Sequence, residues 1–183
     1  AAVASGRRNP GAGRFVNFYY NGTDIYNDVS VNYCVHEMFA EKQADTLVIR
    51  FNDTKGIWSK WQPAAGDTVR FKEGASDTGK MFIHSMKPEN GLFTIRAMSM
   101  PKSGKTKKSK SWEGVRFLQL ANEFAGNHGL TFQNYGCTDQ VYPYIKQDNE
   151  TDFALFHRLC TLEGCQMLIF DGKLLAYNEQ YIE

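Results

Sequence analysis

The sequence predicts a mainly β protein of the α+β class, in which a small antiparallel β-barrel precedes a small α/β domain. Three observations predict this fold. Residues 14–100 alternate apolar and polar side chains between turn signals, residues 101–110 are basic and contain Ser, Gly and Pro, and residues 111–183 combine two helical patterns with a hairpin. Residues 1–13 hold three Gly and one Pro without periodicity, and we interpret them as a flexible arm.

The predicted barrel consists of about six short antiparallel strands. The first strand is Arg14–Tyr20, and Asn21-Gly22 after it is a strong hairpin turn signal. In the next run Val29, Val31, Tyr33 and Val35 alternate with polar residues and Cys34. The remaining runs are Thr46–Phe51, Thr68–Lys72, Lys80–Lys87 and Leu92–Ser99. Strands spaced about ten residues apart are typical of a small barrel or sandwich.

The segment after residue 100 changes character. Residues 101–110 contain Lys102, Lys105, Lys107, Lys108 and Lys110, and their composition predicts a basic linker. Ser111 is then a candidate N-cap of a helix. Its apolar stripe is Phe117, Leu120, Ala121, Phe124 and His128, and Gly129 is a natural residue to follow the last turn.

A second helix and a hairpin complete the predicted α+β domain, 111–183. Asn149 or Thr151 caps this helix, and Gly164 ends it. Asn149 and Asp152 stand at capping-box spacing, although Asp replaces the usual Glu or Gln. Short strands are expected at Leu130–Gln133 and Tyr142–Lys146. Cys165–Phe170 and Lys173–Tyr177 are expected to pair across Asp171-Gly172.

Composition excludes several functional classes. A net charge of +1 gives no global attraction to nucleic acid or to an anionic membrane. No apolar run approaches the roughly 18 residues that a membrane-spanning helix needs. We interpret the four cysteines, Cys34, Cys137, Cys160 and Cys165, as buried structural thiols, with a disulfide or a metal site as the alternative.

Motifs that suggest chemistry are incomplete. Ser99–Thr106 ends like a phosphate-binding loop, but Ser99 stands where the first glycine is required. His36-Glu37 begins like a zinc protease motif, but Ala40 stands at the place of the second histidine. The four histidines are scattered, and we interpret His128 and His157 as structural. We therefore predict no enzymatic activity, no metal and no cofactor.

Candidate interaction residues are more informative than candidate catalytic ones. Four lysines form either a solvated linker or a segment that orders against an acidic partner: Lys105, Lys107, Lys108 and Lys110. No aromatic residue lies among them, so the segment offers no side chain on which a nucleic-acid base could stack. Trp58 and Trp61 form either a sugar-binding platform or a packing and association surface.

The chain resembles a known family in its second half. A basic Ser-x-Ser-Trp segment leads into a helix that ends in His-Gly-Leu, here Lys108–Gly114 and His128–Leu130. A second segment leads into a helix and then a hairpin with Asp-Gly. The matching residues of that segment are Gln147, Glu150, Thr151, Asp152, Phe153, Leu159, Gly164, Asp171 and Gly172. This pattern resembles the late control gene D family, the baseplate hub proteins of contractile-tailed phages, over about residues 105–178.

The resemblance implies a structural role. Such hubs form a three-subunit ring that connects the tail tube to the central spike, and related proteins form the spike base of type VI secretion. Residues 14–100 would be the first barrel and 105–178 an inserted α/β part. Trp112 would anchor the joint between the two parts. Family members continue into a second barrel, which is expected either further along a longer chain or from another chain.

The implied partners are the tail tube protein, the spike protein and other baseplate subunits. The implied state is a homo-oligomer, a trimer ring, that is assembled in the bacterial host cytoplasm and resides in the virion tail or baseplate. Two other classes stay open: a carbohydrate or cell-wall binding module that uses Trp58 and Trp61, and a wall hydrolase.

Overall fold

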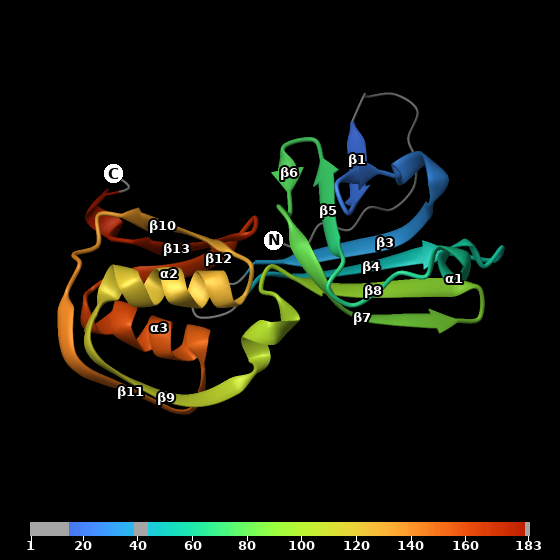
Figure 1. The fold of residues 1–183 in the computed structure, drawn as a ribbon. Helices are drawn as coiled ribbons and strands as arrows, with labels where there is room; N and C mark the ends of the chain where they lie inside the picture. Colours follow the sequence, from blue (N-terminus) through green and yellow to red (C-terminus); the bar gives the residue numbers. More distant parts are fainter. Residues whose placement is uncertain (1–14, 39–43, 182–183) are drawn as a thin grey trace. The chain divides into compact units, whose positions relative to one another are not determined.

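The computed structural model describes residues 15–38 and 44–181, and these residues fall into two compact units. The first unit comprises 15–38 and 44–102, and the second comprises 103–181. Both are drawn in Figure 1. The fold is mainly β with few helices, as predicted. No helix within the described residues is long and apolar enough to span a membrane.

One antiparallel sheet forms the first unit, in the order β2-β1-β5-β7-β8-β4-β3, with β6 paired to β5. Its strands are β1 (Val16–Tyr20), β2 (Thr23–Asp24), β3 (Ser30–Glu37), β4 (Thr46–Asn52), β5 (Thr68–Glu73), β6 (Ser76–Asp77), β7 (Met81–Glu89) and β8 (Leu92–Met98). The short helix α1 is Ile57–Trp61. No pair within 15–38 and 44–102 joins the two ends of this order, so the predicted closed barrel is not confirmed.

The sheet bends between β5 and β7. Only two residue pairs, Thr68↔Phe82 and Val69↔Met81, join these strands. In Figure 1 β1 and β5 therefore run steeply across β4, β7 and β8. The two arms of the sheet enclose an apolar core. Its buried members include Phe18, Leu47, Ile49, Phe51, Val69, Met81, Ile83, Phe93, Ile95 and Ala97.

A β-bulge explains why alternation in β3 differs from the simple pattern. Val31 pairs with Phe51 and Tyr33 pairs with the adjacent Arg50, so Asn32 is the extra residue. Val31 packs against the core before the bulge, whereas Cys34 and His36 are the buried residues after it. The apolar positions Tyr33 and Val35 are consequently only partly buried.

The second unit packs two helices between a sheet and a ribbon (Figure 1). The helices are α2 (Phe117–Asn127) and α3 (Asp152–Leu162). The sheet has the order β10-β13-β12, in which β13 is parallel to β10 and antiparallel to β12. The ribbon pairs β9 with β11 in antiparallel fashion. The strand bounds are β9 (Lys107–Arg116), β10 (Thr131–Tyr135), β11 (Val141–Thr151), β12 (Gln166–Phe170) and β13 (Lys173–Tyr177).

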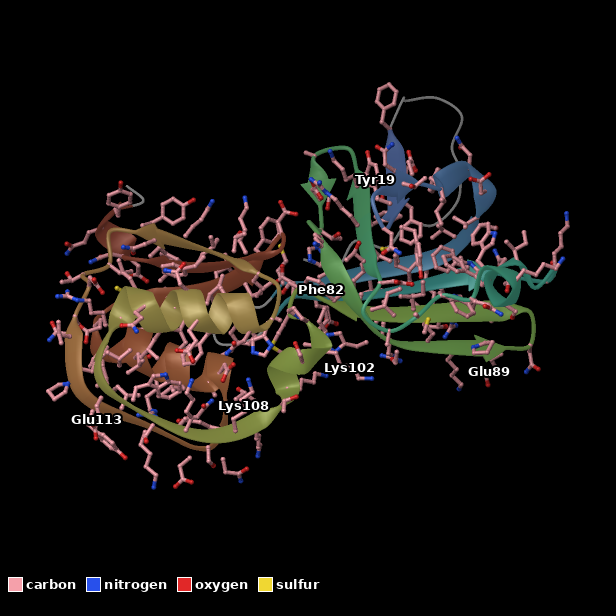
Figure 2. The ribbon with its side chains drawn as sticks, viewed as in Figure 1. Tyr19, Phe82, Glu89, Lys102, Lys108 and Glu113 are labelled. Atoms are coloured by element: carbon pink, nitrogen blue, oxygen red, sulfur yellow. The ribbon has the colours of Figure 1, made fainter. Side chains whose placement is uncertain are left out.

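The predicted linker 101–110 is wrong in its local structure. Lys102–Lys105 form a 3-10 turn, and Lys107 begins the ten-residue strand β9. The helix that was expected after Ser111 consequently begins at Phe117, with Arg116 as its N-cap. Figure 2 shows Lys102 on the turn and Lys108 on the strand. Composition misled here because β9 has mostly exposed side chains and one pairing partner among the described residues.

Several local predictions for the second unit are confirmed. Thr151 caps α3, since its Oγ1 accepts a hydrogen bond from the Ala154 amide at 3.1 Å. Asn149 is not a cap: it has a φ of 48° at the irregularity of β11. The predicted hairpin turn joins β12 to β13, and Asp171 and Gly172 have φ values of 51° and 73°. Positive φ at both central residues is the requirement of a type I′ turn.

Candidate functional site

The first turn of α3 places a carboxylate inside the second unit. Thr151 caps the helix, so Asp152 is its first residue and lies where the helix dipole favours a negative charge. The Asp152 side chain is only 2% exposed. A buried carboxylate is costly unless hydrogen-bond donors and opposite charges surround it. The rest of the site supplies them.

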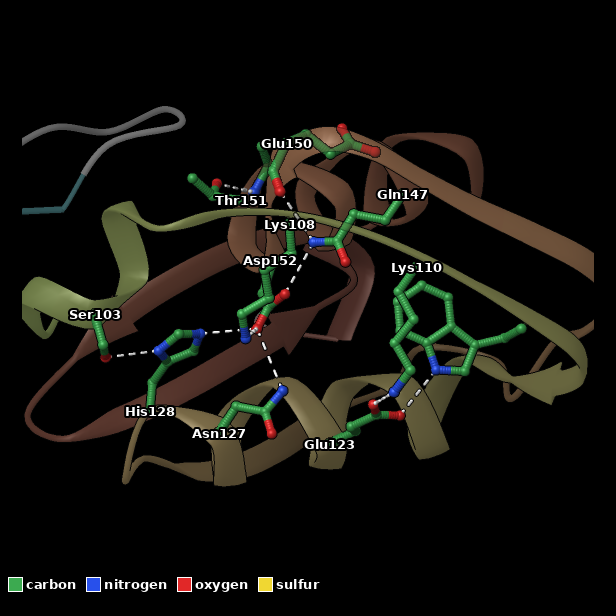
Figure 3. Close-up of polar contacts among 12 residues, drawn as sticks. Ser103, Lys108, Lys110, Glu123, Asn127, His128, Gln147, Glu150, Thr151 and Asp152 are labelled. Carbon is green, nitrogen blue, oxygen red and sulfur yellow. Dashed lines mark hydrogen bonds and ion pairs between the residues drawn. The ribbon is translucent and has the colours of Figure 1, made fainter.

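Four side chains donate hydrogen bonds to Asp152, and they come from three different elements or their ends (Figure 3). His128 Nε2 at 2.9 Å, Lys108 Nζ at 3.2 Å and Asn127 Nδ2 at 3.3 Å contact Oδ2. Gln147 Nε2 contacts Oδ1 at 2.9 Å. The carboxylate therefore joins β9, the end of α2, β11 and α3. We call these five residues the Asp152 network.

The electrostatics of the network favour an ionised Asp152. Burial by itself raises the pKa of this carboxyl group, because water stabilises the charge better than the interior does. Hydrogen bonds from Gln147, His128, Lys108 and Asn127 outweigh burial and hold the pKa below its ordinary value. Asp152 is thus a charged residue held inside the unit by its donors.

His128 links the network to the surface. It is the C-cap residue of α2, and its ring lies 4.8 Å from that of Phe153, centroid to centroid. While Nε2 faces Asp152, Nδ1 lies 2.7 Å from Ser103 Oγ. An ionised carboxylate only accepts hydrogen bonds, so Nε2 donates to Asp152, whereas Nδ1 can accept from the serine hydroxyl when it carries no proton. Ser103 itself is exposed on the 3-10 turn.

Trp112 fastens the ribbon to α2. Its Nε1 donates to Glu123 Oε2 at 3.1 Å, and its ring meets Phe124 edge-on at a centroid distance of 5.8 Å. Lys110 Nζ lies 2.5 Å from Glu123 Oε1 and 4.8 Å from the Trp112 ring centroid. These contacts lie within the second unit. The role of Trp112 at the joint between the two units stays a prediction.

The four predicted interface lysines have different environments. Lys108 and Lys110 contact Asp152 and Glu123 and help to hold the ribbon. Lys105 and Lys107 are exposed on the 3-10 turn and at the start of β9. Because this segment is a turn followed by a strand, it does not form the loop and helix of a phosphate-binding motif.

The two tryptophans of α1 also differ. Trp58 is 2% exposed, and its ring stacks on Phe93 with a centroid distance of 5.1 Å and an interplanar angle of 3°. Trp61 is 45% exposed and meets Trp58 edge-on at 5.2 Å. A sugar-binding platform needs an open aromatic face, which Trp58 does not offer. Trp58 is a core residue, and Trp61 alone of the pair lies at the surface.

All four cysteines are free and buried, in agreement with their interpretation as structural thiols. Burial, followed by the nearby Glu73 charge, raises the pKa of the Cys34 thiol to about 12. Burial and the neighbouring Cys165 raise that of Cys137 to about 12. The Cys34 and Cys137 thiols therefore stay protonated at neutral pH. No group of three or more potential metal ligands occurs within the described parts of the chain.

Sequence reasoning did not assemble the Asp152 network. It treated Asp152 as a capping-box residue and His128 as a structural residue on a helical stripe, and it left Ser103 in a linker. The available signal was that Lys108, His128, Gln147 and Asp152 all belong to the segments that carry the family resemblance. The structure brings these four residues together around one carboxylate.

Comparisons with known proteins identify the fold. No family model matches the chain, and no curated protein matches it significantly. Solved structures do match. A 43 kDa tail protein of prophage MuSo2 from Shewanella oneidensis is 11% identical, with a TM-score of 0.65 over 90% of this chain and 54% of that chain.

Two further structures extend the comparison. The tail protein from Neisseria meningitidis MC58 is 14% identical, with a TM-score of 0.64 over 90% of this chain and 51% of that chain. The Escherichia coli c3393 protein, a component of the type VI secretion system, is 10% identical, with a TM-score of 0.53 over 98% of this chain and 49% of that chain. This chain therefore has the fold of tail and type VI proteins and spans about half of their length.

Proposed function

We propose that this chain is a structural subunit of a contractile phage tail or tail-like particle, a baseplate hub protein that connects the tail tube to the central spike. The observation that carries the proposal is the match of both units, in one chain order, to prophage tail proteins. A fold alone does not define a function, so the proposal also needs support from the residues themselves.

The Asp152 network supplies that support. Lys108, His128, Gln147 and Asp152 match the motif of the late control gene D family, and they meet around the buried Asp152 carboxylate of the second unit. A motif with this position stabilises a fold and leaves the outer surface free for assembly. This is the distribution of residues that a structural subunit needs.

The proposed assembly is a trimer ring in the virion tail or baseplate, assembled in the bacterial cytoplasm. Its neighbours are the tail tube protein, the spike protein and other baseplate subunits. In this arrangement residues 14–100 act as the first hub barrel, closed with the help of neighbouring chains. Exposed edges of the sheet are the surfaces that such neighbours cover.

A second candidate is the base of a type VI-like spike. The likeness to the Escherichia coli c3393 protein, described as similar to the T4 phage tail proteins gp27 and gp5, favours it. The structure of the Francisella PdpA-VgrG complex also matches, with a TM-score of 0.51 over 88% of this chain. Both candidates dock a tube to a spike, and they differ in the particle that contains them.

The test is the mass of the protein in solution, measured by sedimentation velocity at high concentration with and without the tube protein of the same particle. We expect trimers of the 20.8 kDa chain and a heavier complex when tube protein is added. A monomer at every concentration that ignores both tube and spike protein would contradict the hub proposal.

Charge variants test whether the exposed Lys105 and Lys107 bind an acidic partner surface in that assembly. Replacing Lys105 and Lys107 by Glu reverses the charge of the exposed segment, so binding to an acidic partner surface should weaken severalfold, and more at low salt. Lys60→Glu on α1 is the matched control, since Lys60 is also exposed. Equal binding by the control and the double variant would show that Lys105 and Lys107 contact solvent and not a partner.

A further inference from the structure

Ser103, His128 and Asp152 have the relative arrangement of a nucleophile, a base and a carboxylate that orients the base. Ser103 Oγ lies 2.7 Å from His128 Nδ1, and His128 Nε2 lies 2.9 Å from Asp152 Oδ2. Both distances are within the range of such catalytic groupings, which are recognised by geometry and roles. The ring nitrogens have exchanged places relative to the usual serine hydrolase arrangement, but either nitrogen of a neutral imidazole can act as the base.

Burial decides what this arrangement can do. The Asp152 and His128 side chains are each 2% exposed, whereas Ser103 is exposed on its 3-10 turn. The base is therefore held in one orientation, and the hydroxyl is the one member of the three that a molecule in solution can reach. The arrangement thus places one surface hydroxyl against a buried histidine that contacts a carboxylate.

We propose that Ser103 is an acyl-accepting serine that reacts with activated acyl esters. Ser103 Oγ attacks the ester carbonyl carbon while its proton passes to His128 Nδ1. The tetrahedral intermediate then expels the leaving group as its anion, and the proton on His128 Nδ1 passes to water. The products are a serine ester on Ser103, the leaving-group anion and a solvent proton, with no oxidant or cofactor consumed.

The same burial predicts that the reaction stops after one acyl group. Hydrolysis of the serine ester requires a water molecule activated by His128, and the imidazole lies beneath the acylated serine. Leaving groups that need no proton from the enzyme, such as phenolates, suit this site because the acid function of His128 is shielded. We therefore expect stoichiometric acylation with slow turnover. This inference does not depend on the structural function proposed above.

The test treats the full chain with p-nitrophenyl acetate at neutral pH and locates acetyl groups by peptide mass mapping. Hydroxylamine separates serine esters, which it cleaves, from lysine amides, which it leaves. We expect one ester at Ser103, formed about 100-fold or more faster than at Ser109, since a positioned base contributes about 10²–10⁴-fold. Ser109 is the internal control: it is exposed on β9, and its Oγ accepts from the Asn149 amide.

Variants separate activation from folding. Ser103→Ala alters an exposed side chain, so it should fold and lose the ester, while Ser109→Ala should keep it. His128→Gln should fold less stably and, below its melting temperature, acetylate Ser103 no faster than Ser109. Acetylation of lysines only, or equal rates at both serines, would overturn the proposal and leave Ser103 as a structural hydrogen-bonding residue.

Discussion

Replacing Asp152 by asparagine removes the charge of the buried network with little change in shape. The new amide has one accepting oxygen, whereas the carboxylate offers two oxygens to four donors. If that oxygen takes the place of Oδ2, the new NH₂ group faces the donor Gln147 Nε2. If the amide is reversed, the NH₂ group faces His128 Nε2. Either orientation leaves at least one buried donor without a partner.

The magnitude follows from burial. Breaking a buried charged pair costs about 3–5 kcal/mol, because the remaining partner stays desolvated. The low end applies here, since the Lys108 side chain is 40% exposed and can turn to water. We therefore expect a loss of about 3 kcal/mol. A domain the size of the second unit loses about 4–8 °C in Tm per kcal/mol, which gives a decrease of about 12–24 °C.

The assay is thermal unfolding by calorimetry, with Asp148→Asn as the matched control. Asp148 is a neighbouring acid whose side chain is 73% exposed, and its ion pair with Lys146 at 3.6 Å is worth little. Its substitution should change the free energy of unfolding by less than about 0.5 kcal/mol. If Asp152→Asn and Asp148→Asn melt within about 2 °C of each other, the argument for a stabilising buried network is refuted.

Three further predictions test other parts of the structure. The difference in free energy of unfolding between wild type and Asp152→Asn should be constant above about pH 5 and decrease below about pH 4. A carboxyl group whose pKa is lowered on folding stabilises the protein while it is ionised, and it loses this effect as the pH falls through the folded pKa. A difference that vanishes near pH 7 contradicts this. Trp112→Ala should lower the free energy of unfolding by about 2–3 kcal/mol in urea titrations and reduce ring formation, with Trp112→Phe intermediate; unchanged melting and assembly would refute its anchoring role. Trp58→Ala should lower the free energy of unfolding by about 3–5 kcal/mol and Trp61→Ala by less than about 1 kcal/mol in the same titrations. Equal losses in the two variants would contradict the assignment of Trp58 to the core.

Features that depend on neighbouring residues were predicted well. Asn21-Gly22 and Asp171-Gly172 are turns in the structure because residues that tolerate positive φ allow the tight reversal that their flanking strands need. The apolar stripe of α2 is also confirmed, with Phe117, Leu120, Ala121 and Phe124 all buried. In each case the determining interactions lie within a few residues along the chain.

Features that depend on distant partners were missed. The bulge at Asn32 in β3 reverses which side chains face the core, and it is defined by pairing with Phe51 and Arg50 of β4. The Asp152 network draws on Lys108, 44 positions away, and on His128, 24 positions away. Hydrophobic periodicity carries no information about such contacts. Each donor belongs to a residue type that is common at protein surfaces, and only the tertiary structure places it beside Asp152.

The lysines of residues 101–110 show why composition alone misled. A solvated linker and a strand of a two-stranded ribbon both expose most of their side chains, so both select polar residues. Lysine has an added use in such a strand, since its charge discourages pairing of the free edge with other chains. Lys108 and Lys110 also find carboxylates, Asp152 and Glu123, that secure the ribbon to the helices. This strand therefore has the composition of a linker, and it is distinguished from one by its contacts with residues far along the chain. Those contacts make the segment a strand.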